Sequence, residues 1–158
     1  MSARYFIPGL VLLLASCGSP EAETQPVAST WVAQGEMIQV TLPGGNVIQA
    51  ELRQTPQELQ SGMMFRPQLP PDNGMLFVFD SLEPRAFWMY RTEVPLDMIW
   101  LDENKRIVEI AENAKPCGSI DARDCPTYGG VASSLYCLEM AAGQVIRRGL
   151  KVGDQLQF

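Results

Sequence analysis

Two carboxylates lie inside apolar stretches of the sequence and are the first candidates for chemistry. Asp97 stands in "VPLDMIWL" and Glu139 in "LYCLEMAA". A buried carboxylate is costly unless a partner compensates its charge, so each of them needs either a structural partner or a task. Glycosidases cleave sugars with two convergent carboxylates, and Asp97 with Glu139 is therefore the candidate catalytic pair of a hydrolase.

Each of these acids also has a structural interpretation. Asp97 would then accept hydrogen bonds from backbone amides or pair with Arg66 or Arg91, and Glu139 would form a salt bridge with an arginine of the "IRRG" segment, Arg147 or Arg148. Buried carboxylates in proteins are mostly structural groups of this kind.

A third interpretation is a binding site without catalysis. Asp97, Arg66 and Thr92 would form a polar cluster at the floor of a pocket whose walls include Trp88 and Met89, as in many small-molecule sites. Trp88 and Trp100 are core residues in the simplest reading, whereas an exposed aromatic pair would indicate stacking on carbohydrate such as peptidoglycan.

The composition excludes several classes of function. The chain has 158 residues, a net charge of −6 and no histidine. The absence of histidine removes Ser-His and Cys-His catalysis and histidine metal sites, and the acidic charge argues against nucleic acid as a partner. We expect no cofactor. Cu(I) binding through thioethers is a weaker hypothesis, because methionine is also a good filler of irregular cores; its ligands would be Met63, Met64, Met75 and Met89.

The first residues are typical of an export signal. One cation, Arg4, precedes the apolar run "FIPGLVLLLA", which ends at "LLASCGS". Small residues before a cysteine resemble the bacterial lipobox, in which Cys17 is lipidated; a cleaved secretory signal with an incidental cysteine is the alternative. We expect residues 1–16 to be a signal peptide and residues 17–34 a lipidated tether, which places the protein on the outer membrane facing the periplasm in a Gram-negative host.

The remaining cysteines fit an oxidising compartment. Cys117 and Cys125 flank the polar loop "CGSIDARDC", a spacing that a disulfide closes easily, whereas Cys137 lies in an apolar strand pattern. We expect a Cys117–Cys125 bridge and a buried, unpaired Cys137.

Residues 35–158 have the pattern of one mainly β domain. Alternating segments flank "LPGG" as a hairpin, "TPQELQSG" carries the capping signals of a short helix, and "LDMIWLDENKRIVEI" predicts a second hairpin. A turn through "SLEPR" would separate two further strands. Seven or eight short strands with one or two short helices predict a compact antiparallel sandwich or a partly open barrel.

The central segments "GMMFR", "GMLFVF", "FWMYRT", "PLD" and "LEMAAGQVIRRGLKVGD" resemble those of the DUF192 (UPF0127) family from about residue 36 onward. The resemblance implies a jelly-roll-like β fold and no established activity. Its hallmark positions would be Gly62, Met64, Arg66, Gly74, Met75, Phe77, Phe79, Trp88, Met89, Thr92, Pro95, Leu96, Asp97, Glu139, Gly143, Gly153 and Asp154. Tyr90 and Arg91 stand where members commonly have Lys-Asn.

Together these observations predict a non-catalytic, membrane-anchored domain of the cell envelope that binds a small ligand or an envelope protein. A hydrolase using Asp97 and Glu139 is the alternative from a different class, and a purely structural envelope lipoprotein is the third. The separation of the two carboxylates discriminates the first two, because acid-base chemistry needs both in one cleft.

Overall fold

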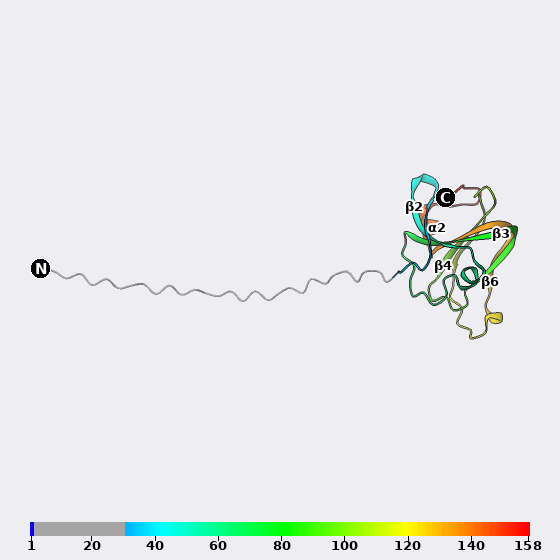
Figure 1. Ribbon diagram of the computed structural model, residues 1–158, viewed down its shortest axis with the longest axis horizontal. Coiled ribbons are helices and arrows are strands. Elements are labelled where there is room, and N and C mark those ends of the chain that lie inside the picture. Colours follow the sequence, from blue (N-terminus) through cyan, green and yellow to red (C-terminus); the bar gives the residue numbers. More distant parts are fainter. Residues whose placement is uncertain (2–30) are drawn as a thin grey trace.

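The computed structural model describes residue 1 and residues 31–158. The predicted signal peptide and Cys17 lie outside the described residues except for Met1, and most of the predicted tether does too. Among the residues described, no helix is both long enough and apolar enough to cross a bilayer. Residues 37–158 fold into one mainly β domain with two short α-helices, as predicted (Figure 1).

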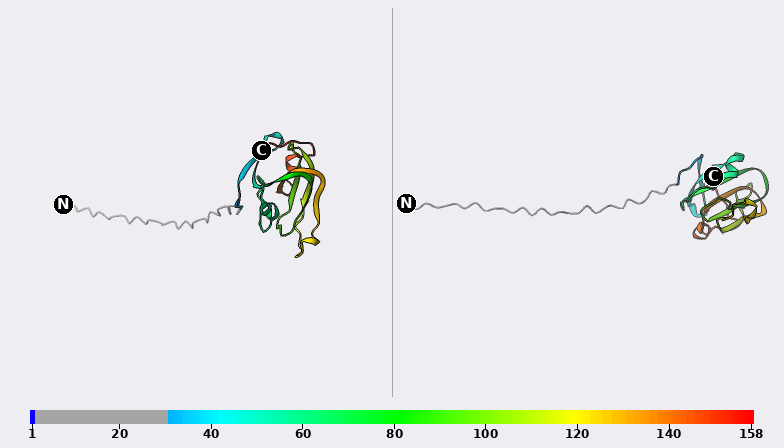
Figure 2. Two further views of the ribbon diagram at one scale, coloured as in Figure 1. Left: turned by 45° about the vertical axis from the view of Figure 1, so that its right-hand side comes forward. Right: turned by 90° about the horizontal axis from the view of Figure 1, so that it is seen from below.

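The domain is built on a six-stranded mixed sheet with the strand order β1-β2-β3-β6-β4-β5. The strands coil without closing into a barrel (Figure 2). The elements are β1 (Met37–Thr41), η1 (Pro43–Gly45), β2 (Val47–Arg53), α1 (Pro56–Ser61), β3 (Asn73–Trp88), β4 (Leu96–Leu101), β5 (Ile107–Ala114), η2 (Ala122–Asp124), β6 (Thr127–Ala141) and α2 (Gln144–Arg148).

The sheet is covered on both faces, and every residue of β4 is buried. One core, the α2 face, packs alternate residues of the strands against β1, α2 and the C-terminal segment; its members include Ile99, Leu138 and Val145. The other core, the α1 face, packs the opposite set against α1 and the 63–69 segment, with Met98, Trp100 and Cys137 among its members. Because successive strand residues point to opposite sides, each strand residue belongs to one core only.

Local sequence signals account for the short elements. Thr55 caps α1 in a complete capping box with Glu58, and Gly62 ends the helix. The β1–β2 hairpin turns through Pro43–Gly45, and β4 and β5 pair as the predicted second hairpin. The C-terminal "DQLQF" contributes only isolated bridges, among them Thr41 with Gln157, which bring the C-terminus beside β1 (Figure 1).

Two expectations on the strands were wrong. The predicted turn through "SLEPR" is part of β3, which runs for 16 residues and bends at register shifts on either side of Pro84 instead of breaking. The described part of the chain therefore has six strands, two of them long, and not seven or eight short ones. The sheet also contains one parallel pair, β2 with β3, because the chain crosses over through α1 and residues 62–72 before β3 begins.

Gly129 allows the long strands β3 and β6 to approach the buried Trp100. Its φ is +73°, and a Cβ atom at this position would lie 2.3 Å from the Trp100 ring. Only glycine fits both the backbone conformation and the space.

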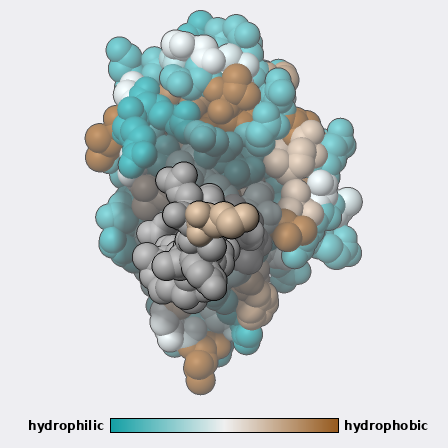
Figure 3. All heavy atoms as spheres, turned by 90° about the vertical axis from the view of Figure 1, so that its left-hand side faces the viewer, coloured by the Kyte–Doolittle hydropathy of each residue, from teal (hydrophilic) through white to brown (hydrophobic). Residues whose placement is uncertain are grey.

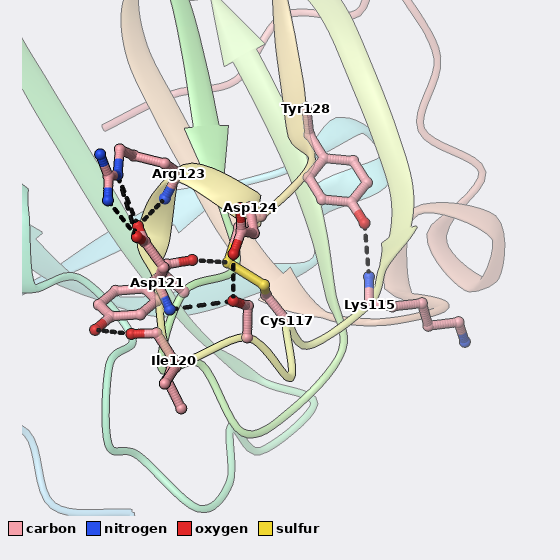
Figure 4. The surroundings of a disulfide bond; sticks show 10 residues. Lys115, Cys117, Ile120, Asp121, Arg123, Asp124 and Tyr128 are labelled. Atoms are coloured by element: carbon pink, nitrogen blue, oxygen red, sulfur yellow. Dashed lines mark hydrogen bonds and ion pairs between the residues drawn. A yellow bond between two sulfur atoms is a disulfide. The ribbon is translucent and has the colours of Figure 1, made fainter.

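The predicted disulfide between Cys117 and Cys125 is confirmed, and Cys137 is buried and unpaired as expected. Polar contacts within the loop stabilise its conformation: the Asp121 carboxylate accepts from the Arg123 side chain, and Ser119 donates to Asp124 (Figure 4). Outside the loop, Tyr90 donates to the carbonyl of Ile120, and the backbone of Cys117 pairs with that of Tyr90. The loop is thus tied to the segment that follows β3.

Candidate functional site

Asp97 and Glu139 face opposite sides of the sheet. In the pairing of β4 with β6, Asp97 is opposite Met140, whereas Glu139 is opposite Met98. Paired residues share a face and adjacent residues do not, so Asp97 lies in the α2 face and Glu139 in the α1 face. The two carboxylates do not converge on one cleft, and the geometry does not fit the acid-base pair of a hydrolase.

Asp97 is an internal anchor. It is fully buried, and its two oxygens accept backbone hydrogen bonds from Asn113 and Val145, each at 2.8 Å. These contacts join β4 to the end of β5 and to the first turn of α2. This is the structural role considered for Asp97, with backbone amides as partners rather than an arginine. The predicted cluster of Asp97 with Arg66 and Thr92 does not form, because both of those residues lie over the α1 face.

The partner of Arg66 is Glu51, which sequence analysis did not single out. Glu51 lies in β2 with no exposed surface and accepts from Arg66 at 2.6 and 3.1 Å. It also forms a salt bridge of 2.7 Å with Arg53, whose Nε contacts the sulfur of Met75 at 3.4 Å. Burial lowers the pKa of Arg53, while Glu51 opposes this effect. The alternation in "VIQAELR" gives β2 an apolar face at Ile48, Ala50 and Leu52 and a polar face at Glu51 and Arg53. Both of these polar residues are buried, on the side of the sheet that residues 62–69 cover.

Glu139 lies in β6, two strands away from Glu51, with β3 between them. Glu51, Met75, Glu139 and Met98 are paired in one row across β2, β3, β6 and β4. The carboxyl of Glu139 is almost fully buried, and its Oε2 has no hydrogen-bond partner. Desolvation raises the pKa of Glu139 to about 8, although Arg53 and Arg66 act in the opposite direction. Glu139 is therefore mostly a neutral acid at pH 7 and can donate a hydrogen bond.

The expected salt bridge of Glu139 with Arg147 or Arg148 does not form. The α2 helix lies over the opposite face, and Arg148 pairs instead with Asp72 at 2.7 Å. Parity along β6 again decides the outcome, since Glu139 points away from the helix that follows it.

Trp88 divides a groove on the surface above Glu139. It is 43% exposed and stands between two hollows of about 440 Å³ each. One hollow extends along β3 to Phe79 and Arg85, and the other extends toward Phe65 and Arg91. Gln60 of α1 lines both. We call these two hollows, together with a narrow pocket between them that is described next, the Trp88 groove.

A narrow pocket of about 30 Å³ opens between the two hollows and also has Trp88 and Gln60 in its wall. Glu139 and Thr92 are polar groups in it, and its apolar wall includes Met63, Met64 and Phe77. This volume holds about two water molecules or a group of similar size. The unpartnered acid of Glu139 thus belongs to a small cavity beneath an exposed aromatic ring.

Two residues of the groove have an unusual backbone conformation. Phe65 and Arg91 have φ values of +60° and +53°, which are uncommon for side chains other than asparagine or aspartate. The amide of Phe65 donates to the carbonyl of Arg91 at 2.8 Å, and the Arg91 guanidinium lies 5.2 Å from the Phe65 ring centre. Tight pairing of two turns therefore holds these side chains outward. Such conformations concentrate at functional sites.

The predicted site residues are distributed as follows. Trp88 and Thr92 lie at the groove, Arg66 is buried beneath it, and Met89 is a core residue with no exposed surface. Trp100 is also core, so Trp88 and Trp100 do not form the exposed aromatic pair considered above; the exposed Trp88 lies instead beside the half-buried Tyr90, with ring centres 6.2 Å apart. Met63, Met75 and Met89 pack within the α1-face core, and Met64 lines the groove. No group of three or more Cys, Asp or Glu suited to a metal occurs in residues 31–158.

Comparison with known proteins identifies relatives of unknown activity. The model of the DUF192 family, described as "Uncharacterized ACR", matches residues 38–158. A protein of unknown function from Novosphingobium aromaticivorans is 29% identical over 95% of this chain and 100% of its own, with a TM-score of 0.70. A putative transcription regulator from Sinorhizobium meliloti is 33% identical over 80% of this chain and 96% of its own, with a TM-score of 0.68. No curated protein matches.

We expect Asp97→Asn to destabilise the domain by about 2–4 kcal/mol, because the amide group retains one acceptor and turns a donor toward the second backbone N–H. Urea unfolding of the full chain measures this difference. Asp72→Asn removes a carboxylate that is mostly exposed and should cost less than about 1 kcal/mol. Equal stability of the two variants would contradict the anchoring role of Asp97.

The raised pKa of Glu139 makes a prediction on pH. The unfolded chain loses this proton near pH 4.5 and the folded chain near pH 8. The contribution of the neutral acid to stability is therefore complete below pH 4.5 and is lost as the pH rises to 8, by about 3–5 kcal/mol in total. Glu139→Gln should remove this dependence, so that its stability relative to wild type rises between pH 5 and pH 8 in urea unfolding. A constant difference between the two proteins would refute the assignment.

Proposed function

The chain belongs to the DUF192 family, whose activity is not established, and from the geometry of the Trp88 groove we propose that it is a non-catalytic domain of the cell envelope that binds a small ligand. The observation that carries the proposal is the exposed Trp88 between two hollows, above a buried acid without a partner. Sites for small molecules commonly combine apolar and aromatic walls with a few polar groups that converge on the ligand.

The groove has the rigidity that a binding site needs. Its wall is held by the bridge between Met64 and Thr92, and the disulfide loop supports Tyr90 from the outside. Preformed walls reduce the ordering cost of binding. A reaction has less support than binding, because the two acids predicted to act together are separated by the sheet.

A docked protein partner has less support than a small ligand. Apart from Phe65 and Trp88 in the groove, the strongly exposed apolar residues belong to different elements, among them Leu82 in β3, Ile120 in the disulfide loop and Ile146 in α2. In Figure 3, the visible hydrophobic groups lie in several places around the edge of the view, with hydrophilic groups among them. Scattered apolar side chains of this kind are normal on protein surfaces and do not form a docking patch.

We place the domain on the periplasmic side of an outer membrane, anchored by lipid on Cys17. The lipobox-like "LLASCGS", the polar composition of residues 18–34 and the disulfide of the folded domain support this address. A tether of this length spans about 50–60 Å when extended, so the groove could reach ligands well beyond the lipid headgroups.

Ligand binding can be tested by the thermal stability of the full chain in mild detergent, with a panel of soluble envelope saccharides, peptidoglycan fragments and metals including Cu(I). Saturation at one hundred times Kd should add about 2.7 kcal/mol and raise the Tm by several degrees. Trp88→Ala should abolish the shift. Leu82→Ala, an exposed residue of the same strand outside the groove, should keep it. A ligand that shifts both variants equally would place the site elsewhere.

The anchor is tested by fractionation. In a Gram-negative host the wild-type chain should sediment with outer membranes and take up a labelled fatty acid, whereas Cys17→Ala should lose the label because the thioether cannot form. Ser19→Ala serves as the control and should behave as wild type. Absence of label from the wild-type chain would favour a cleaved secretory signal over the lipid anchor.

A further inference from the structure

The charge of the Trp88 groove is opposite to that of the whole chain. The chain carries a net charge of −6, yet no Asp or Glu lines either hollow. Arg85 lies in one hollow and Arg91 in the other, with Trp88 between them. Two hollows that are lined by an arginine each and by no acid, with only the neutral Glu139 in the pocket between them, favour a negatively charged ligand.

Both arginines have donors to offer. The Nη2 of Arg85 donates to Ser81 and lies 3.7 Å from the exposed carboxylate of Asp80, whereas its Nη1 has no hydrogen bond or ion pair in the described part of the chain. Arg91 stacks against the rings of Phe65 and Tyr90, and no salt bridge with an acid occupies it in the described part of the chain. Guanidinium groups bind carboxylates with two parallel hydrogen bonds.

The centre of the groove suits a sugar ring. Trp88 presents a partly exposed ring beside Tyr90, and the amides of Gln57 and Gln60 lie on the exposed side of α1 in the groove wall. An aromatic face packs against the C–H face of a pyranose, while side-chain amides can bind hydroxyl groups at the ring edge.

The narrow pocket beneath Trp88 suits an acetamido group. Its volume of about 30 Å³ and its methionine and phenylalanine wall match a methyl group with a neighbouring carbonyl. Glu139 lines this pocket and is neutral at the pH of the periplasm, so its carboxyl group can donate a hydrogen bond to that carbonyl oxygen once the O–H turns toward the pocket. A ligand carbonyl would thus satisfy a buried polar atom that has no partner within the protein.

From these observations we infer that the Trp88 groove binds a chain of N-acetylated amino sugars that carries carboxylates, the chemistry of the peptidoglycan glycan strand. The inference rests on the proposed function and specifies its ligand. One sugar ring stacks on Trp88, its acetamido group enters the pocket of Glu139 and Thr92, and carboxylates on neighbouring units meet Arg85 and Arg91.

A peptide added as a strand is the main competing ligand, because β2 ends opposite Phe77 and pairs with no residue of β3 beyond it. The rest of this β3 edge is poorly suited to pairing. It contains Pro84, register shifts on both sides of that residue, and the charged Arg85. Proline, bulges and charge are features that prevent strand addition at sheet edges.

The test is isothermal titration of the full chain in mild detergent with four probes of similar length. The N-acetylglucosamine tetramer carries acetamido groups without charge, and cellotetraose carries neither. A tetrasaccharide of alternating N-acetylglucosamine and N-acetylmuramic acid carries both, and tetraglutamate carries charge alone. We expect the alternating tetrasaccharide to bind at least tenfold more tightly than the neutral N-acetylated tetramer, and that tetramer at least tenfold more tightly than cellotetraose.

Variants assign each preference to its residue. Arg91→Asn suits the backbone at φ +53° and should weaken binding of the alternating tetrasaccharide more than binding of the neutral tetramer, which reduces the tenfold preference for carboxylates; Arg85→Gln should act likewise. Glu139→Leu should remove the preference for acetamido groups, whereas Glu139→Gln keeps a donor and should retain most of it. Circular dichroism checks the folding of each variant.

The outcomes separate the inference from the proposed function. Equal affinity for the charged and neutral N-acetylated tetramers overturns the inference and leaves a small-ligand site in place. Tighter binding of tetraglutamate than of any sugar also overturns it, in favour of an acidic peptide. If Trp88→Ala leaves the Kd of every bound probe unchanged, both the inference and the proposed function are rejected.

Discussion

Side-chain parity in a sheet covered on both faces is the constraint on which the rest of this structure depends. Adjacent residues of β4 and β6 enter two separate cores. A shift of one position along the strand therefore moves a functional group from one face of the sheet to the other. Asp97 consequently fixes the α2 helix on one side, and Glu139 faces the cavity under Trp88 on the other. The same parity rejects a hydrolytic pair without any appeal to the chemistry of either acid.

The polar interior of the α1 face is costly and is concentrated in one place. Glu51 satisfies Arg53 and Arg66 together, so that two buried guanidinium groups share one carboxylate. Glu139, two strands away, lacks a full set of partners and remains neutral instead. Removing the charge is the usual outcome when burial is not compensated, and here it leaves a neutral acid in the wall of a cavity that lies between the two hollows of the groove.

The walls of that groove are held by turns rather than by the sheet. Phe65 and Arg91 face each other across paired turns in left-handed conformations, and the Cys117–Cys125 loop supports Tyr90 from behind. Left-handed backbone conformations of this kind are unfavourable, and they persist only where the surrounding structure holds the backbone in place. The rigid sheet below and the constrained turns above give a preformed surface, which is consistent with binding and with selection by charge and shape.

The sequence by itself determined what depends on neighbouring residues: the mainly β class, the capped α1, both hairpins and the short disulfide loop. These features follow from alternation, capping residues and turn chemistry, which act over a few positions. It also identified Asp97, Glu139, Trp88 and Thr92 as residues of interest. Only the tertiary structure decided their roles, because strand register, a long-range property, assigns each acid to its side of the sheet. The tertiary structure also decided that the polar face of β2 is buried, because the crossover through residues 62–72 covers it.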